Sequence, residues 1–151
     1  MSKCTRILAL FLAAAVIQRV TFAVGIKETA MLTISGPGLS QPLEVTDGDT
    51  LALSNVFAGT FIGAPAVNPP DAELPRYRIV FDIQTMEGVR RAAYTVLYCK
   101  NRWTGDAFVY VPGYGDDGYR RNIGTILRKG QDGRWHRAGG PWSQAINAHL
   151  P

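Results

Sequence analysis

The sequence predicts an all-β protein, mainly antiparallel and arranged as a sandwich or a small barrel, with a short helix at its C-terminal end. Three observations support this class: short segments in which apolar and polar residues alternate, turns rich in glycine and proline between them, and an amphipathic helical pattern near the end of the chain. If residues 119–129 were helical, the alternative would be an α+β fold.

Alternation predicts five strands in the first three quarters of the chain. Tyr77–Gln84 is the clearest, because apolar residues occupy every second position. Turn residues at 36–38 and 47–49 bound the first two segments, and the last three follow one another closely enough to form an antiparallel meander. The expected strands are Ala30–Ser35, Thr50–Ser54, Tyr77–Gln84, Ala92–Lys100 and Ala107–Val111.

Two segments do not follow a simple pattern. Phe57–Pro75 contains four prolines and no alternation, and we expect it to be a functional loop or a strap across a sheet edge. Residues 119–129 combine helical spacing of apolar residues with Gly124 and Thr125, which favour a strand. We interpret 119–129 as a strand that forms a hairpin with Arg134–Ala138, because turn residues lie between them.

The last residues predict a short helix. Pro141 suits the first turn of a helix, and Trp142, Ile146 and Leu150 recur at helical spacing on one side. We expect Trp142 to anchor this helix in the hydrophobic core, and Trp135 to be buried there as well.

Residues 1–23 have the features of a secretory signal peptide. Lys3 and Arg6 precede an unbroken apolar run of 11 residues, Ile7–Ile17, and the segment ends in a small residue of the kind that signal peptidase requires. A membrane-spanning helix needs about 20 apolar residues, so the run is too short for a permanent anchor. We expect the leader to be removed, residues 24–151 to form one domain without stable membrane insertion, and the mature protein to be secreted or kept in the periplasm or cell envelope.

Charge and cysteine content argue against two classes of protein. The full chain has a formal net charge of +4, but three of its 16 Lys and Arg residues lie in the leader and all 12 acidic residues lie downstream, so the mature chain has 13 minus 12, or +1. This balance does not favour nucleic-acid binding. Cys4 lies in the leader, so Cys99 is the only cysteine of the mature chain and no internal disulfide is expected.

The loop Gly113–Gly118 matches the glycine pattern of dinucleotide-binding proteins, but it does not predict a cofactor. Asp116 and Asp117 would place negative charge where a pyrophosphate must bind, and no alternation of strands with long helices surrounds the loop. The same two aspartates, like Asp47 and Asp49, are weak calcium candidates. Their spacing matches no EF-hand, so we interpret them as solvated turn residues and predict neither a metal nor a cofactor.

Cysteine and histidine suggest an alternative function, a small secreted hydrolase that uses Cys99 with His136, or loop carboxylates. However, Cys99 shares a predicted strand face with Leu97, which favours a buried, inert thiol. We expect His136 to be exposed or half-exposed on its strand, and His149 to pack against or cap a helix. A non-catalytic protein is therefore the preferred interpretation.

Aromatic and cationic side chains gather on two predicted loops, 101–106 and 113–121, at the two ends of the expected strand Ala107–Val111. The candidate ligand-binding residues are Trp103, Tyr114, Tyr119, Arg102, Arg120 and Arg121. Flat aromatic rings beside arginine are used both for stacking on sugar rings and at protein interfaces. We therefore expect an exported, non-catalytic binding module whose ligand is a glycan or an envelope protein.

Overall fold

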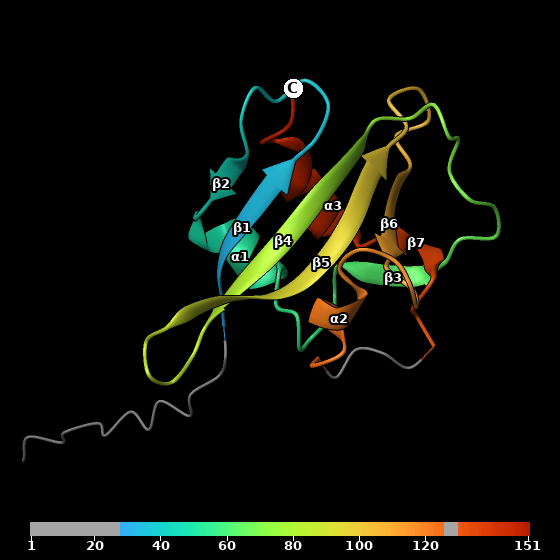
Figure 1. Ribbon diagram of the computed structural model, residues 1–151. Helices are drawn as coiled ribbons and strands as arrows, with labels where there is room; N and C mark the ends of the chain where they lie inside the picture. The colour runs from blue at the N-terminus through green and yellow to red at the C-terminus, as the bar shows by residue number, and fades with distance from the viewer. Residues whose placement is uncertain (1–27, 126–129) are drawn as a thin grey trace, which may run out of the picture.

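Seven antiparallel strands form one open sheet in the computed structural model, which describes residues 28–125 and 130–151. Their order across the sheet is β2-β1-β4-β5-β6-β7-β3, so β2 and β3 are the edges. The sheet is strongly twisted, and β3 runs nearly crosswise to β4 (Figure 1). The strands are Thr29–Ser35 (β1), Leu43–Val45 (β2), Ile62–Pro65 (β3), Arg76–Gln84 (β4), Arg90–Lys100 (β5), Ala107–Val111 (β6) and Arg134–Ala138 (β7).

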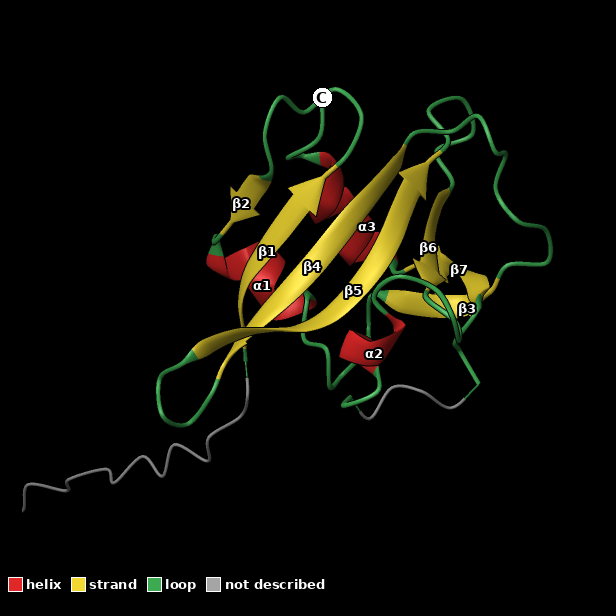
Figure 2. Ribbon diagram, viewed as in Figure 1, coloured by secondary structure: helices red, strands yellow, loops and turns green. Residues whose placement is uncertain are grey.

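Three short helices accompany the sheet: α1 (Gly48–Leu53), α2 (Tyr119–Asn122) and α3 (Gly140–Asn147). Helices α1 and α3 contact each other and cover one face of the sheet, which we call the core face, whereas α2 packs against β5 (Figure 2). We call the opposite face the outer face. The predicted all-β class with a short C-terminal helix is confirmed, and it takes the form of a single open sheet.

Alternate residues of the central strands build the core face, as the alternation predicts. One cross-strand row runs from Ile34 through Ile79 to Val96, and all three side chains are fully buried. Trp142 of α3 is 1% exposed and completes this core. Its ring lies 5.4, 6.3 and 5.5 Å from the ring centroids of three aromatic side chains, Phe61, Phe81 and Tyr98. The predicted role of Trp142 as an anchor is therefore confirmed. The expectation that Trp135 is buried in the same core is wrong, because Trp135 is half-buried against a separate cluster on the outer face.

The expected strand Thr50–Ser54 is wrong, because α1 occupies this part of the chain. Asp47 has an extended backbone and its Oδ1 accepts a hydrogen bond from the backbone N–H of Thr50 at 2.9 Å. An aspartate in this position satisfies one of the free amides of the first helical turn and so favours a helix. Over a segment this short, the cap outweighs the alternation of apolar residues.

The interpretation of 119–129 as a strand is wrong for Tyr119–Asn122, which form α2, and residues 126–129 lie outside the described residues. The expected hairpin is also wrong, since β7 pairs with β6 and β3. Asn122 explains the difference. Its side chain accepts from Thr95 N at 2.7 Å and donates to Thr95 O at 2.8 Å.

The Asn122 amide takes the place of a neighbouring strand. Pairing between β5 and β6 ends at Leu97 and Tyr110, so the Thr95 peptide groups have lost their partner on that side of β5. A primary amide offers the same donor and acceptor as a backbone peptide and satisfies both. Gly118, at φ +91°, lets the chain approach closely, because a Cβ there would lie 3.1 Å from the Thr95 Cβ.

The proline-containing segment Phe57–Pro75 is not free of regular structure, because it contains β3 at the sheet edge. The predicted leader, 1–23, lies outside the described residues. None of the helices in the described ranges is long and apolar enough to cross a membrane. In the same ranges Cys99 is a buried free thiol, and the β-rich domain contains no disulfide.

Candidate functional site

A groove with a volume of about 460 Å³ opens beside the start of β6. It forms because the chain must travel from β3, at the sheet edge, to β4, near the sheet centre, and in doing so passes over the outer face. The segment after β3 makes one wall, and the turn between β5 and β6 makes the other. The groove volume lies within the usual range of small-molecule sites. The groove is lined by 64–71, Leu74, Asn101, Asp106, Phe108 and Arg137.

The floor of the groove is a small hydrophobic cluster on the outer face. Phe108 of β6 packs with Leu74 and Cys99, and all three side chains are buried. Strand register places Phe108 between Cys99 of β5 and Arg137 of β7. The guanidinium carbon of Arg137 lies 5.0 Å from the centroid of the Phe108 ring, a cation–π contact that keeps the ring in place.

One wall is the tight turn 101–106, which is held in a single shape by its own hydrogen bonds. The Asn101 side chain accepts from the backbone N–H groups of Trp103 and Thr104, at 2.9 and 3.1 Å. Gly105, at φ +77°, donates its N–H to Asn101 O. Trp103 belongs to this turn, between the lining residues Asn101 and Asp106, and is 87% exposed.

The second wall is the segment 64–71, which contains three of the four prolines found between 57 and 75. The N–H of Ala66 donates to Trp135 O at 2.9 Å, which fastens the segment to β7. Proline fixes its own φ angle, so Pro69 and Pro70 reduce the number of shapes that this wall can adopt. Val67 projects from it and is 96% exposed. A ligand would therefore meet two walls that are already ordered.

Two carboxylates and one guanidinium line the groove. Asp106 forms an ion pair with Arg137 and accepts from the Thr104 hydroxyl at 3.0 Å. These hydrogen bonds lower the pKa of Asp106, so this carboxyl is ionised at neutral pH. The carboxylate of Asp71 accepts from the backbone N–H of Glu73, at 3.0 Å, and from no other group among the residues that the structure describes.

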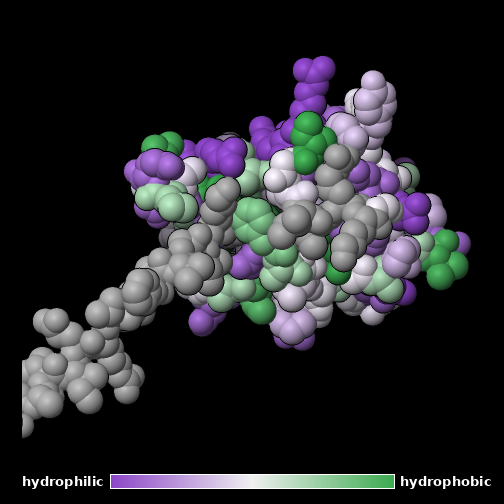
Figure 3. Space-filling model, turned by 90° about the horizontal axis from the view of Figure 1, so that it is seen from below, coloured by the Kyte–Doolittle hydropathy of each residue, from purple (hydrophilic) through white to green (hydrophobic). Residues whose placement is uncertain are grey.

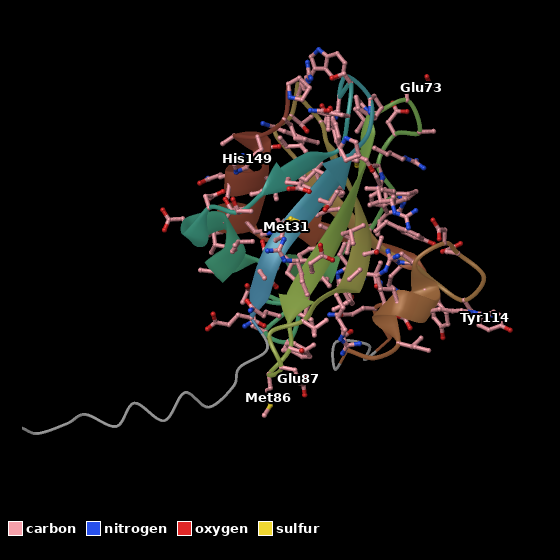
Figure 4. The ribbon with its side chains drawn as sticks, turned by 60° about the vertical axis from the view of Figure 1, so that its left-hand side comes forward. Met31, Glu73, Met86, Glu87, Tyr114 and His149 are labelled. Atoms are coloured by element: carbon pink, nitrogen blue, oxygen red, sulfur yellow. The ribbon has the colours of Figure 1, made fainter. Side chains whose placement is uncertain are left out.

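The predicted binding residues fall into two surfaces at opposite ends of β6. Trp103 and Arg102 lie at its start, where Arg102 donates to Pro151 O at 2.9 Å. Tyr114 and Tyr119 follow its end, with ring centroids 5.7 Å apart in an edge-to-face contact. Tyr114 is 92% exposed and points away from the molecule (Figure 4).

The remaining two predicted binding residues belong to α2. Arg120 is exposed, whereas Arg121 is half-buried and donates to the Thr95 hydroxyl at 2.6 Å. Arg121 therefore fastens α2 to β5. The turn 101–106 lines a groove through Asn101 and Asp106, which makes the groove beside Trp103 the stronger candidate site.

Asp116 and Asp117, the weak calcium candidates, use their carboxylates to hold the 113–118 loop to the sheet. Asp116 accepts from the Tyr110 hydroxyl at 2.6 Å and from Gly113 N at 2.8 Å, and Asp117 pairs with Arg78. These bonds lower the pKa of both carboxyls, while the bond to Asp116 raises the pKa of Tyr110 to about 12. Within residues 28–125 and 130–151, no three acidic, His or Cys side chains group as metal ligands.

Cys99 and His136 lie on opposite faces of the sheet. Cys99 is in register with Phe108 on the outer face, whereas His136 is in register with Val109 on the core face, and β6 runs between them. Because β5 and β7 are two strand-to-strand spacings apart in the sheet, the two residues are separated by about 10 Å. Burial raises the pKa of Cys99 to about 11, so its thiol stays protonated. The two residues cannot act as nucleophile and base.

The histidines have structural partners. The expectation that His136 is exposed is wrong, because it is 1% exposed and its Nε2 lies 3.0 Å from Gln131 O. His149, near the end of α3, lies 3.1 Å from a carboxylate oxygen of Asp47 and 3.4 Å from the Thr50 hydroxyl. Since Asp47 caps α1, His149 joins the end of one helix to the start of the other, as its predicted packing or capping role implies.

Sequence reasoning singled out both walls of the groove but not its floor. Phe108, Asp71 and Arg137 carry no local motif, and only strand register brings Phe108 and Arg137 together. The spacing of about 35 residues between the walls gave no sign that they meet. No family model, curated protein or solved structure matches this chain.

Proposed function

We propose that the mature chain is an exported, non-catalytic binding module of the cell envelope or extracellular space, and that the groove beside Trp103 binds a glycan. The observation that carries this proposal is the groove itself. It combines an aromatic floor, an exposed indole beside it, and flat polar side chains around it. These polar side chains are Asn68, Asp71, Asn101, Asp106 and Arg137.

The groove chemistry suits a sugar ring better than a peptide or a large apolar ligand. Carboxylates and amides present two neighbouring acceptors or donors in one plane, and adjacent sugar hydroxyls offer a matching pair. The exposed Trp103 indole supplies a flat apolar surface for the C–H groups of a ring. Ordered walls reduce the entropy lost on binding.

A protein partner is the weaker interpretation of the same surface. Protein interfaces usually contain a contiguous apolar centre. Figure 3 shows the end of the molecule opposite the 101–106 turn, and there the most hydrophobic side chains reach the surface at separate points. The large exposed apolar side chains of the described residues form separate pairs, Val67 and Trp103 on the groove walls, Met86 and Val89 between β4 and β5, and Tyr114 and Ile123 beyond β6.

Calorimetric titration of the purified protein with neutral oligosaccharides tests the proposal. Chito-, cello-, malto- and xylo-oligosaccharides make up the panel. We expect saturable binding to at least one, and a loss of at least about tenfold in affinity in Trp103→Ala, because truncating a stacking aromatic costs on the order of 1.4 kcal/mol or more. Tyr114→Ala is the matched control, since it removes an equally exposed aromatic from the other end of β6.

Two results would contradict the proposal. If no oligosaccharide of the panel binds, a glycan is excluded as the ligand. If Trp103→Ala and Tyr114→Ala lose affinity equally, the groove is excluded as the binding site. Export is tested separately, by expressing the full chain in a bacterium and sequencing the N-terminus of the protein recovered outside the cytoplasm. A start after Ala23 is expected, and retention of the full leader in the cytoplasm would contradict export.

A further inference from the structure

We infer that the groove selects uncharged glycans and rejects those that carry carboxylate, sulfate or phosphate groups. This inference rests on the proposed function and adds the chemical class of the ligand. Its basis is the balance of charge among the lining residues, where two carboxylates, Asp71 and Asp106, face a single guanidinium, Arg137.

Arg137 offers an anionic ligand only a partly neutralised charge. Its guanidinium pairs with Asp106 through Nη1 and lies over the Phe108 ring. An anion that reaches the other N–H donors of this half-exposed guanidinium also comes close to the Asp106 carboxylate. Hydrogen bonds from Arg137 and Thr104 stabilise the ionised form of Asp106, so its negative charge stays beside Arg137.

The other cations at this end of the molecule face elsewhere. The guanidinium carbon of Arg76 lies 5.3 Å from the centroid of the Trp135 ring. Lys100 and Arg102 line a separate depression of 170 Å³, and Arg102 donates to Pro151 O. The carboxylate of Asp71 forms no ion pair within the part of the chain that the structure describes, so the groove keeps a net negative charge.

Uncharged sugars can use the same groups that repel an anion. Carboxylate oxygens accept strong hydrogen bonds from hydroxyl groups, and the free amide hydrogens of Asn68 can donate in return. An anionic sugar gains the same contacts but meets Coulomb repulsion from Asp71. At a separation of about 5 Å in water this repulsion weakens binding by roughly fourfold.

The experiment compares cellotetraose and maltotetraose with the same chains oxidised at C6 to uronic acids, by calorimetry. We expect the neutral form of the bound sugar to bind about fourfold more tightly than its oxidised form. Asp71→Asn should bring the ratio of the two affinities close to one, because it removes the carboxylate that repels the oxidised form. Raising NaCl from about 50 to about 500 mM should narrow the gap in the wild-type protein.

Asp49→Asn is the matched control, because it removes an exposed carboxylate on α1, away from the groove, and should change neither affinity. Equal or tighter binding of the oxidised sugar overturns the charge selection and leaves the glycan site intact. A ratio of neutral to oxidised affinity that Asp71→Asn does not change also overturns it. Absence of binding by either form, together with none across the wider neutral panel, overturns the proposed function itself.

Discussion

The two faces of the sheet use the same kinds of aromatic residue differently. On the core face, Trp142 and Tyr98 direct their polar groups to partners inside the protein: Trp142 Nε1 donates to the Ser54 hydroxyl at 2.9 Å. Tyr98 donates to the Asn147 side chain at 2.8 Å. On the outer face, arginine side chains lie over the rings instead, with Arg137 over Phe108 and Arg76 over Trp135.

Because of this difference, we expect the core face to determine the stability of the fold and the outer face to bind the ligand. The core face is sealed by α1 and α3, so its aromatic side chains contribute buried area and leave no surface for a ligand. The outer face is covered only in part, by α2 at one end and the 64–75 segment at the other, and the groove lies under the second. Substitutions on the two faces should therefore affect different properties.

The largest expected effect is on the core face. Trp142→Ala should lower the free energy of unfolding by about 3 to 5 kcal/mol, because it removes a fully buried indole and leaves a cavity. Trp103→Ala should change the same quantity by less than about 0.5 kcal/mol, since Trp103 is mostly exposed. Urea denaturation followed by circular dichroism measures both, and similar losses would contradict the division between the faces.

The next effect concerns the Asn122 amide, where α2 meets β5. Asn122→Ala should cost about 2 to 3 kcal/mol, because it leaves the buried N–H and C=O of Thr95 without their side-chain partner. Amide hydrogen exchange at Thr95 should accelerate together with that of α2. Slow exchange at Thr95 in this variant would show that another group satisfies its peptide.

A smaller effect compares one hydroxyl on each face. Tyr98→Phe removes a buried hydrogen bond to Asn147 and should cost about 1 kcal/mol. Tyr110→Phe removes the bond to the exposed Asp116 and should cost at most about half as much, because water replaces the lost partner. Equal costs in denaturant unfolding would mean that the outer loop contributes as much to stability as the core.

The smallest effect is a dependence on pH. The pKa values of Asp106, Asp116 and Asp117 are lowered by hydrogen bonds, so their contribution to stability is present above about pH 4 and declines as the pH falls through the lowered values. Burial raises the pKa of Asp82, so its ionisation has the opposite sign and disfavours the folded state as the pH rises above about 4.

Two variants test these opposite effects of carboxylate ionisation on the stability of the folded state. Asp116→Asn should reduce the loss of stability between pH 5 and pH 3, and Asp82→Asn should leave stability at pH 7 unchanged or slightly higher. Denaturant unfolding across this range measures both. A steeper acid loss in Asp116→Asn, or marked destabilisation by Asp82→Asn at pH 7, would contradict the assigned directions.

The sequence predicted most of the core face, because alternation in long strands reports burial directly. Tyr77–Gln84 coincides with β4 apart from one residue, and the helical spacing of Trp142 and Ile146 places α3 correctly. Short helices were harder to predict from the sequence. Helix α1 depends on one capping aspartate, and α2 depends on the contact of Asn122 with a strand 27 residues away.

The candidate site could be predicted only in part. The exposed Trp103 and the proline-containing segment were identified from composition and turn chemistry. Their meeting over Phe108 follows from the position of β3 at the far edge of the sheet, which no local pattern in Phe57–Pro75 indicates. The same topology separates Trp103 from Tyr114, two residues that the sequence suggested would act together.

The three tryptophans allow the most direct test, because they lie in three different environments. Trp103 is exposed beside the groove, Trp135 is half-buried on the outer face, and Trp142 is in the core. Indole N–H resonances in a proton–nitrogen correlation spectrum report each one separately during titration with the neutral oligosaccharide panel. We predict a saturable shift of the Trp103 resonance with the Trp142 resonance unchanged. A Trp103 resonance that does not move with any sugar, or three resonances that move together, would contradict the assignment of the groove as the binding site.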